Sequence, residues 1–418
     1  MSILYRERIK ADVARQLNQR RGSPEWLNRD IRFDPSFRLN EYYKIKLDFF
    51  IELCANSRRK ENYLNLEILI ANLLRKRAVR PLRVSLNTRD WKRTRYNKAG
   101  ESTIKLIHKL HKEGLIELMK GYITKKQSRQ ARIWPTEKLL EYFPKLPNGV
   151  IYDPVEVVQL RDNKGRLKDY KETAQTRRIR AILTRANKVN NAANIVYKPY
   201  REYVLHPSLI AIFKRKFTLY GRLHTKGHRH YQGLSSDERK EILINGEKIV
   251  ELDFSGLHPH LLYAMEEKQL NGDPYNIIDD GPPVARTFFK HILLCMLNAK
   301  DEKSAEQAAN YWLYKHHYER NILNNWGIRS ARPLMTKFRE AHKHIERHFC
   351  NGKDTGLKIM NLDARIALDI VDHFAKQNIP ILAIHDSFIV QRKYKEELRQ
   401  VMESTYKKHT NGFKCKIK

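Results

Sequence analysis

Two apolar, strand-like segments each lead to an aspartate, and this pairing restricts the fold more than any other feature of the chain. Residues 248–256, KIVELDFSG, predict a strand that ends at Asp253. In residues 379–391, the runs PILAI and SFIV flank His385 and Asp386, as the two arms of a tight hairpin would. Each segment therefore predicts a carboxylate at the end of a buried strand.

Two aspartates that lie side by side in a low dielectric repel each other strongly unless a cation lies between them. Magnesium suits this position, because it binds one or two carboxylates together with substrate phosphates. Paired metal ions activate the attacking oxygen and stabilise the leaving oxygen in phosphoryl transfer. Taken singly, either aspartate could instead be a turn or cap residue, and both interpretations stay open on the residues alone.

Between these segments, Arg286 and Lys290 are four residues apart, so a helix would present both on one face. The positions around them are apolar: Phe288, Phe289, Ile292, Leu293 and Leu294. We therefore expect the two cations to face a cleft, where they would stabilise the charge of a triphosphate and of leaving pyrophosphate. A lysine there can also act as a general acid toward pyrophosphate. An exposed basic face is the alternative.

The charge of the chain favours a polyanionic partner. The 418 residues carry a formal net charge of +34, of which residues 1–250 contribute +29, whereas residues 251–300 are net −3. Such a surplus makes nucleic acid the first partner to consider, and the acidic interruption predicts a place for divalent metal. No apolar run approaches the ~20 residues of a membrane span, and the four cysteines form no CxxC pair. We expect no membrane association, and a location in the cytoplasm of a bacterial or phage-infected cell or at the nucleoid.

Residues 1–145 predict a basic, mostly helical domain. The predicted elements are a helical stretch near 5–20, helices at 46–56, 65–76 and 100–112, and strands at 115–121 and 130–136 around the basic turn 124–129. Three helices followed by a strand, a basic turn and a strand are typical of a winged helix, a variant of the helix-turn-helix DNA reader. A helical packing module is the alternative. The basic run 171–188 predicts either a phosphate-contacting helix or a solvated helix face.

Four segments together resemble the family A polymerases, which include DNA polymerase I-like enzymes and single-subunit phage-type RNA polymerases. LDFSGLHPHLLYA (252–264) resembles motif A, and AIHDSFIV (383–390) resembles motif C. RTFFK (286–290), followed by HILLCMLNA, is similar to the motif of the fingers helix, and TLYGR (218–222) is similar to the T-x-x-G-R element. Each motif alone is a weak signal, but the ordered set, which covers residues 215–395, is specific.

The resemblance implies an α+β fold: a right-hand polymerase palm and fingers, preceded by an N-terminal mostly helical, winged-helix-like domain. It implies a nucleic-acid-binding domain at 1–145, a linker or reduced thumb at 146–199, a palm at 200–270 and 355–418, and fingers at 271–354. The implied activity is template-directed nucleotidyl transfer, in which the 3′-hydroxyl of a primer attacks the α-phosphate of a nucleoside triphosphate.

The resemblance also implies roles for individual residues. Asp253 and Asp386 would bind two magnesium ions (Mg²⁺, with Mn²⁺ as a substitute), with the backbone carbonyl of Phe254 as a further ligand. The nucleotide would be bound by Arg286, Lys290, Phe254, His258, Leu294 and Asn298, with Lys290 also catalytic. The DNA template and primer would be contacted by Thr218, Gly221, Arg222 and His385.

Three positions depart from the family pattern. Asn298 and Ala299 replace the aromatic residue at the end of the fingers helix, and Ser387 follows Asp386 as in the RNA polymerases. His258 replaces the glutamate that blocks the ribose 2′-hydroxyl in DNA polymerases, but it is bulky enough to act as a gate. We favour a DNA polymerase of a phage or mobile element, dependent on a processivity or replication partner. The alternatives are a single-subunit RNA polymerase or primase, and a non-catalytic replication initiator with a decayed polymerase core.

Overall fold

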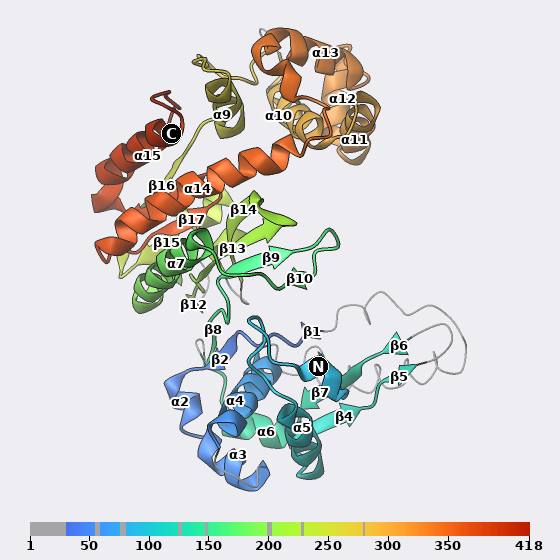
Figure 1. Ribbon diagram of the computed structural model, residues 1–418, viewed down its shortest axis with the longest axis vertical. Coiled ribbons are helices and arrows are strands. Elements are labelled where there is room, and N and C mark those ends of the chain that lie inside the picture. The colour runs from blue at the N-terminus through green and yellow to red at the C-terminus, as the bar shows by residue number, and fades with distance from the viewer. Residues whose placement is uncertain are drawn as a thin grey trace. The chain divides into compact units, whose positions relative to one another are not determined.

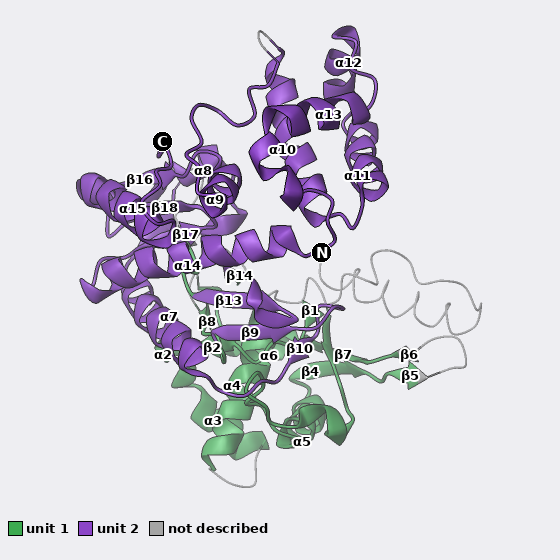
Figure 2. Ribbon diagram, turned by 45° about the horizontal axis from the view of Figure 1, so that its top comes forward, with its two compact units in different colours: residues 1–156, 202–208, 226–230 green, residues 157–201, 209–225, 231–418 purple. Residues whose placement is uncertain are grey.

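The computed structural model describes residues 31–54, 59–75, 81–123, 128–146, 149–198, 203–226, 230–278 and 281–418. The fold is mixed α+β, and the chain divides into two compact units (Figure 2). Unit 1 comprises Met1–Glu156, Glu202–Ser208 and Lys226–His230, and unit 2 comprises Val157–Arg201, Leu209–Thr225 and Tyr231–Lys418. The helical stretch expected near 5–20 and most of the basic turn expected at 124–129 lie outside the described residues.

Unit 1 is a helical layer on a small sheet. Its helices are α2 (Glu41–Lys44), α3 (Leu47–Cys54), α4 (Lys60–Leu74), α5 (Ser102–Lys112) and α6 (Glu137–Tyr142). Its main sheet has the order β1 (Ile31–Arg32), β3 (Leu82–Val84), β7 (Ala131–Pro135) and β4 (Ile116–Met119). A second pair joins β2 (Phe37–Leu39) to β8 (Val150–Tyr152), and a third joins β5 (Tyr122–Ile123) to β6 (Ser128–Arg129). The apolar faces of α3, α4 and α5 form one core with the strands.

Within the described residues of unit 1, the helices expected at 46–56, 65–76 and 100–112 and the strands expected at 115–121 and 130–136 are present, with α4 starting five residues earlier than the apolar pattern indicated. The sequence analysis missed β3 and the short 3-10 helix η2 (Thr88–Trp91), which separate α4 from α5. A three-residue strand has too few residues for a visible alternation. Strand β3 forms because it pairs with β1 and β7, which are distant in sequence.

Unit 2 contains two sheets. The first has the order β10 (Leu167–Lys168), β9 (Val158–Arg161), β13 (Leu209–Lys214) and β14 (Lys216–Thr225). Five strands of the second follow the order β11 (Ile195–Tyr197), β15 (Ile242–Ile244), β16 (Glu247–Asp253), β18 (Ser387–Gln391) and β17 (Leu382–Ile384), all antiparallel. The basic run 171–188 falls mostly within helix α7 (Ala174–Ala192). Residues 157–198 are thus folded into unit 2 through β9, β10, α7 and β11.

Helix α14 (Thr355–Lys376) organises unit 2, since it contacts β14, α7 and α15 (Lys395–His409). Its first turns lie beside the helices α10 (Pro283–Asn298), α11 (Glu302–Lys315), α12 (His317–Asn325) and α13 (Arg332–Ala341), which gather at one end of the unit (Figure 1). Helix α10 is central to that group because its apolar face is buried and it contacts α11, α12 and α13. Helix α9 (Leu257–Met265) follows β16 and begins two residues before Pro259.

Candidate active site

Strand pairing brings Asp253 and Asp386 together. Asp253 is the last residue of β16 and is paired in register with Ser387 of β18. Asp386 and His385 form the two-residue turn between β17 and β18, in which Ile384 pairs with Ser387. The amide of Phe254 donates a hydrogen bond to the carbonyl of Asp386 at 3.3 Å. The predicted strand and hairpin are therefore confirmed, and the end of β16, which carries Asp253, lies beside the turn that carries Asp386.

The two carboxylates lie in an environment that opposes negative charge. Burial raises the pKa of Asp253 to about 7, the charge of Asp386 adds to this rise, and Lys418 and Lys290 oppose it. Burial also raises the pKa of Asp386, as does the carboxylate of Asp363. Among the described residues, no cation forms an ion pair with either aspartate. Such a pair has the electrostatic character of a divalent-cation site before the cation is bound.

The protein donors at this place suit magnesium better than zinc. The described residues contain no group of three or more His, Cys, Asp and Glu side chains that could hold a metal. Two carboxylates and a main-chain carbonyl match an ion that keeps several waters and takes further oxygens from substrate phosphates. Zinc would require three or four nitrogen, sulfur or oxygen ligands from the protein. The side chain of Phe254 is buried against Tyr406, with ring centroids 5.7 Å apart, so only its backbone is available as a donor.

Residues 416–418 pair with the end of β16 beside the carboxylates. Asp253 and Lys418 exchange two backbone hydrogen bonds, of 2.9 and 3.1 Å, and the Ser255 amide donates to the carbonyl of Lys416 at 2.8 Å. Lys418 lines a cavity of about 710 Å³ together with Asp253 and Asp386. Lys418 was not predicted as part of the site, because nothing in the sequence indicates that a segment so far from Asp253 pairs with it.

Arg222 is held by a buried carboxylate from another element. Its Nε and Nη2 atoms on β14 lie 2.9 and 2.7 Å from Oδ2 of Asp363 on α14, whose side chain is only 2% exposed. His258 of α9 completes the group, with Nε2 at 3.0 Å from Arg222 Nη2 and 3.8 Å from Asp363 Oδ2. Burial alone would raise the pKa of Asp363, but its interaction with His258 and the charge of Arg222 hold it below its usual value. No motif in the sequence marks Asp363 as the partner of Arg222.

His385 presents a ring nitrogen without a partner near this group. Its Nδ1 atom is buried and has no hydrogen-bond partner among the described residues. Its ring lies 5.7 Å from that of His224, whose Nε2 is 3.0 Å from the Tyr220 hydroxyl. Burial and then the charge of Arg222 lower the pKa of His385, so the neutral ring is favoured. According to its tautomer, Nδ1 of a neutral ring can donate one hydrogen bond to a bound substrate or accept one from it.

Four residues of α10 at intervals of four form one face of the helix: Arg286, Lys290, Leu294 and Asn298. Lys290, Leu294 and Asn298 are exposed, whereas Phe288, Phe289, Ile292 and Leu293 are buried, so the prediction that Arg286 and Lys290 share one face of a helix is confirmed. That this face lines a cleft stays a prediction. Lys290 lies close enough for its charge to lower the pKa of Asp253.

Two members of this face have protein partners that the sequence analysis did not foresee. Arg286 forms an ion pair with Asp273, with Nε and Oδ2 2.6 Å apart, and its guanidinium carbon lies 5.5 Å from the centroid of the Tyr275 ring. The Asn298 side chain occupies the space that a Cβ atom at Gly356 would fill, and its Nδ2 donates to the carbonyl of Leu294 at 2.8 Å. Asn298 therefore packs against the first turn of α14.

The two remaining residues of the T-x-x-G-R element differ in their surroundings. Thr218 is exposed on β14, whereas Gly221 is buried. Gly221 has a φ of +85°, and a Cβ atom there would lie 2.8 Å from Phe213 Cε1 and 3.0 Å from Asn361 Nδ2. Its side-chain hydrogen thus allows β14 to pack closely against α14.

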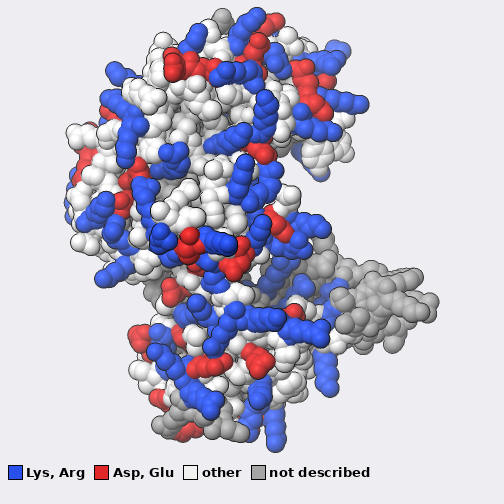
Figure 3. All heavy atoms as spheres, in the orientation of Figure 1, with Lys and Arg blue, Asp and Glu red and all other residues white. Residues whose placement is uncertain are grey.

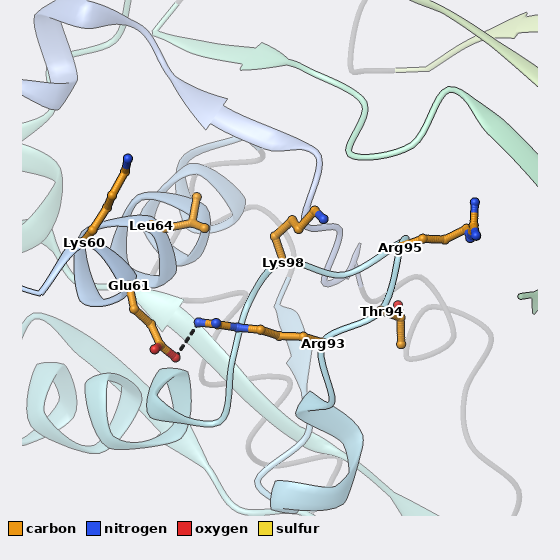
Figure 4. Close-up of a pocket in the computed structure, with 7 residues that line it drawn as sticks. All are labelled: Lys60, Glu61, Leu64, Arg93, Thr94, Arg95 and Lys98. Carbon is orange, nitrogen blue, oxygen red and sulfur yellow. Dashed lines mark ion pairs between the residues drawn. The ribbon is translucent and has the colours of Figure 1, made fainter. Parts of the chain in front are cut away.

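Unit 1 has a basic cavity of its own (Figure 4). It has a volume of about 620 Å³ and is lined by Lys60, Glu61, Leu64, Arg93, Thr94, Arg95 and Lys98. Arg93 extends toward Glu61, with which it forms an ion pair of 2.6 Å, while the side chains of Lys60, Lys98 and Arg95 point in different directions. Cations that diverge in this way suit an extended polyanion better than one small anion. On the face drawn in Figure 3, lysine and arginine side chains are spread over both units.

No known protein family matches this sequence, and no curated protein matches it. Among solved structures, the chain is similar to the POL domain of Pol1 from M. smegmatis in complex with DNA primer-template and dNTP. The TM-score is 0.30 at 12% sequence identity, and the match covers 58% of this chain and 50% of that chain. The chain thus spans about half the length of that protein, and a likeness this distant does not show a common fold. None of the described helices is long and apolar enough to cross a membrane.

Proposed function

We propose that this protein is a template-directed nucleotidyltransferase, with a DNA polymerase of family A type as the favoured form. The observation that carries the proposal is the pair Asp253 and Asp386. Asp253 ends β16, Asp386 lies in the turn that leads into the neighbouring strand β18, and both have raised pKa values without a cation partner among the described residues. The four ordered motifs that resemble the family, all within unit 2, support the same activity.

Asp253, Asp386 and the carbonyl of Phe254 would hold two Mg²⁺ ions, for which Mn²⁺ could substitute, and bound metal supplies charge stabilisation at the attacking and leaving oxygens. Lys290 would bind the phosphates of the incoming nucleotide and transfer a proton to leaving pyrophosphate. Arg286 would contribute once its pairing with Asp273 is exchanged for a phosphate. Leu294, which is exposed between Lys290 and Asn298, would lie along the nucleotide.

Arg222 and His385 would position the primer end. Asp363 fixes the guanidinium of Arg222, and the unpaired Nδ1 of His385 offers one directional hydrogen bond. Thr218 would contact the nucleic-acid backbone, and Gly221 would act through packing. In this assignment the palm is built from 200–270 and 355–418, the fingers are 271–354, and 146–199 contributes a reduced thumb through α7.

Unit 1 would hold template DNA as a winged-helix-like module. Its element order, three helices with strands β4 and β7 after the third helix, supports this role, as do the exposed Lys105 and Lys112 of α5 and the basic cavity of Figure 4. Partners of the whole protein would be template and primer DNA, nucleoside triphosphates and a processivity or replication partner. Phosphate contacts of this kind should weaken steeply with salt.

The ring of His258 supports a preference for deoxynucleotides. Arg222 and Asp363 hold it from one side, so it is a bulky group in a fixed place at the start of α9. Ribonucleotide use, as in an RNA polymerase or primase, is the second candidate, and Ser387 after Asp386 is the feature that favours it.

The test supplies Mg²⁺, primed or unprimed templates, and either dNTPs or NTPs to wild-type protein and to Asp386→Asn. Asp162→Asn, which makes the same chemical change in an external turn of unit 2, is the matched control. We expect template-dependent incorporation of dNTPs by wild type and the control, and none by Asp386→Asn. Equal incorporation by all three proteins would exclude the assigned site. DNA binding without incorporation would favour the non-catalytic initiator.

A further inference from the structure

Helices α11 and α12 expose three tyrosines that have no structural role in the core. Tyr311 and Tyr314 are 60% exposed and Tyr318 is 77% exposed. The opposite side of α11 is well packed: Trp312 stacks on Phe288, with centroids 5.2 Å apart, and Leu313 is buried. The exposed rings are therefore not the consequence of a loosely packed helix. We call Tyr311, Tyr314 and Tyr318, with Lys315 between them, the tyrosine face.

Two rings of the tyrosine face, those of Tyr311 and Tyr314, lie together with a cation beside them. Tyr311 and Tyr314 are close to parallel, with an interplanar angle of 27° and a centroid separation of 6.3 Å. The ammonium group of Lys315 lies 5.5 Å from the centroid of Tyr311 and 6.0 Å from that of Tyr314. Tyr318 is the second residue of α12, three positions after Lys315 at the end of α11.

The composition of this surface suits single-stranded nucleic acid. Of the large aliphatic side chains of α11 and α12, Leu313 and Leu323 are buried and Ile322 is half-buried, so none is fully exposed beside the rings. Flat rings that alternate with a cation are the combination that binds single-stranded nucleic acid: bases stack on the rings, and lysine attracts the phosphates. The excess of positive charge in the whole chain points to the same partner.

We propose that the tyrosine face binds single-stranded nucleic acid by stacking unpaired bases on Tyr311, Tyr314 and Tyr318. The binding itself is independent of catalysis. Its use, to hold the unpaired template strand at the helical end of unit 2, rests on the proposed function. The partner is recognised through its bases, so duplex DNA, whose bases are already stacked, should not compete well for this face.

The test measures binding of the full chain to a fluorescein-labelled dT15 oligonucleotide and to a blunt 15-base-pair duplex by anisotropy, over a series of salt concentrations. The variants are Tyr311→Leu/Tyr314→Leu/Tyr318→Leu and the matched triple change to Phe, which keeps the rings. We expect the Leu triple variant to bind dT15 at least about fivefold more weakly, as for a single stacked base. The Phe triple variant should bind as wild type does. The duplex affinity should be the same for all three, and the salt slope should not change because no phosphate contact is removed.

Equal dT15 affinity for wild type and the Leu triple variant would overturn the proposal and would leave the face to a protein partner. An equal loss with the Phe and Leu variants would also overturn it, since the rings would then not be the binding element. The single variant Tyr318→Leu, at the most exposed ring, checks that a loss does not come from misfolding.

Failure of the proposed function would show in nucleotide incorporation and not in dT15 binding. Asp386→Asn should bind dT15 as wild type does but should not incorporate nucleotides. If wild type incorporates no nucleotide and the Leu triple variant still loses dT15 affinity, the tyrosine face is supported and only its assigned use in polymerisation is lost.

Discussion

The guanidinium of Arg222 is held at 2.7–2.9 Å by the carboxylate of Asp363, which lies 141 residues further along the chain and is almost completely buried. The pair joins β14 to α14, and His258 contacts both partners. Since Asp363 also contributes to the raised pKa of Asp386, the pair influences the candidate site both by position and by charge.

We expect Asp363→Ala to destabilise the protein by about 3–5 kcal/mol, because it leaves the charge of Arg222 largely buried without its partner. Urea unfolding measures the loss. The double variant Asp363→Ala/Arg222→Met should recover much of it, since no uncompensated charge remains. Asp237→Ala, which breaks an exposed pair with Lys240, should leave stability nearly unchanged. A double variant no more stable than the single variant would contradict this account.

We expect Gly221→Ala to cost more stability than Gly246→Ala. Both glycines have positive φ, of +85° and +79°, so each substitution pays about 1–2 kcal/mol of backbone strain. At Gly221 the new methyl group also meets Phe213 and Asn361, while at Gly246 nothing lies within 4 Å. Thermal unfolding of the two variants compares these costs, and equal shifts would show that β14 and α14 are not closely packed there.

The metal-free protein should be stabilised at pH 8 by Asp253→Asn. Because the pKa of Asp253 in the folded state is raised to about 7 by burial and by Asp386, its ionisation opposes folding. This penalty is complete above pH 7 and declines as the pH falls toward the unfolded pKa near 4. The stability difference between variant and wild type should therefore shrink from pH 8 to pH 4, as measured by urea unfolding in the presence of EDTA. A difference independent of pH would contradict the raised pKa.

Asp369→Asn should show the opposite dependence on pH. A hydrogen bond with His409, together with contacts from Arg178 and Lys408, holds the pKa of Asp369 well below its usual range. Its ionised form therefore stabilises the fold above pH 4, and this contribution is lost as the pH falls further. The variant should be less stable than wild type at pH 7 and closer to it at pH 3. Equal stability at pH 7 would mean that these contacts contribute nothing.

Lys290→Ala should lower the rate of nucleotide incorporation by about 10²–10⁴-fold if Lys290 transfers a proton to pyrophosphate. Lys303→Ala, on the neighbouring helix α11, is the control and should behave as wild type. Single-turnover incorporation with saturating dNTP separates the chemical step from binding. A change only in the dNTP concentration required would assign Lys290 to phosphate binding alone.

The local parts of this site could be predicted from the sequence. Strand β16, the turn at His385 and Asp386, and the polar face of α10 each follow from apolar spacing over fewer than twenty residues. Asp363, Asp273 and Lys418 could not be found in this way. Each reaches its partner through tertiary packing between elements that are separated along the chain. The sequence around such an aspartate or lysine contains no pattern that identifies the residue it will contact.

Helix α14 touches three parts of unit 2 with residues spaced along its length: Gly356 against Asn298, Asp363 with Arg222, and Asp369 with Arg178. A helix of 22 residues is a stiff rod about 33 Å long. A shift of α10 that pushes on its first turn cannot be absorbed locally, so it would tilt the whole rod. Movement of α10, which carries Lys290, would then be accompanied by movement of the Arg222 guanidinium beside Asp253 and Asp386.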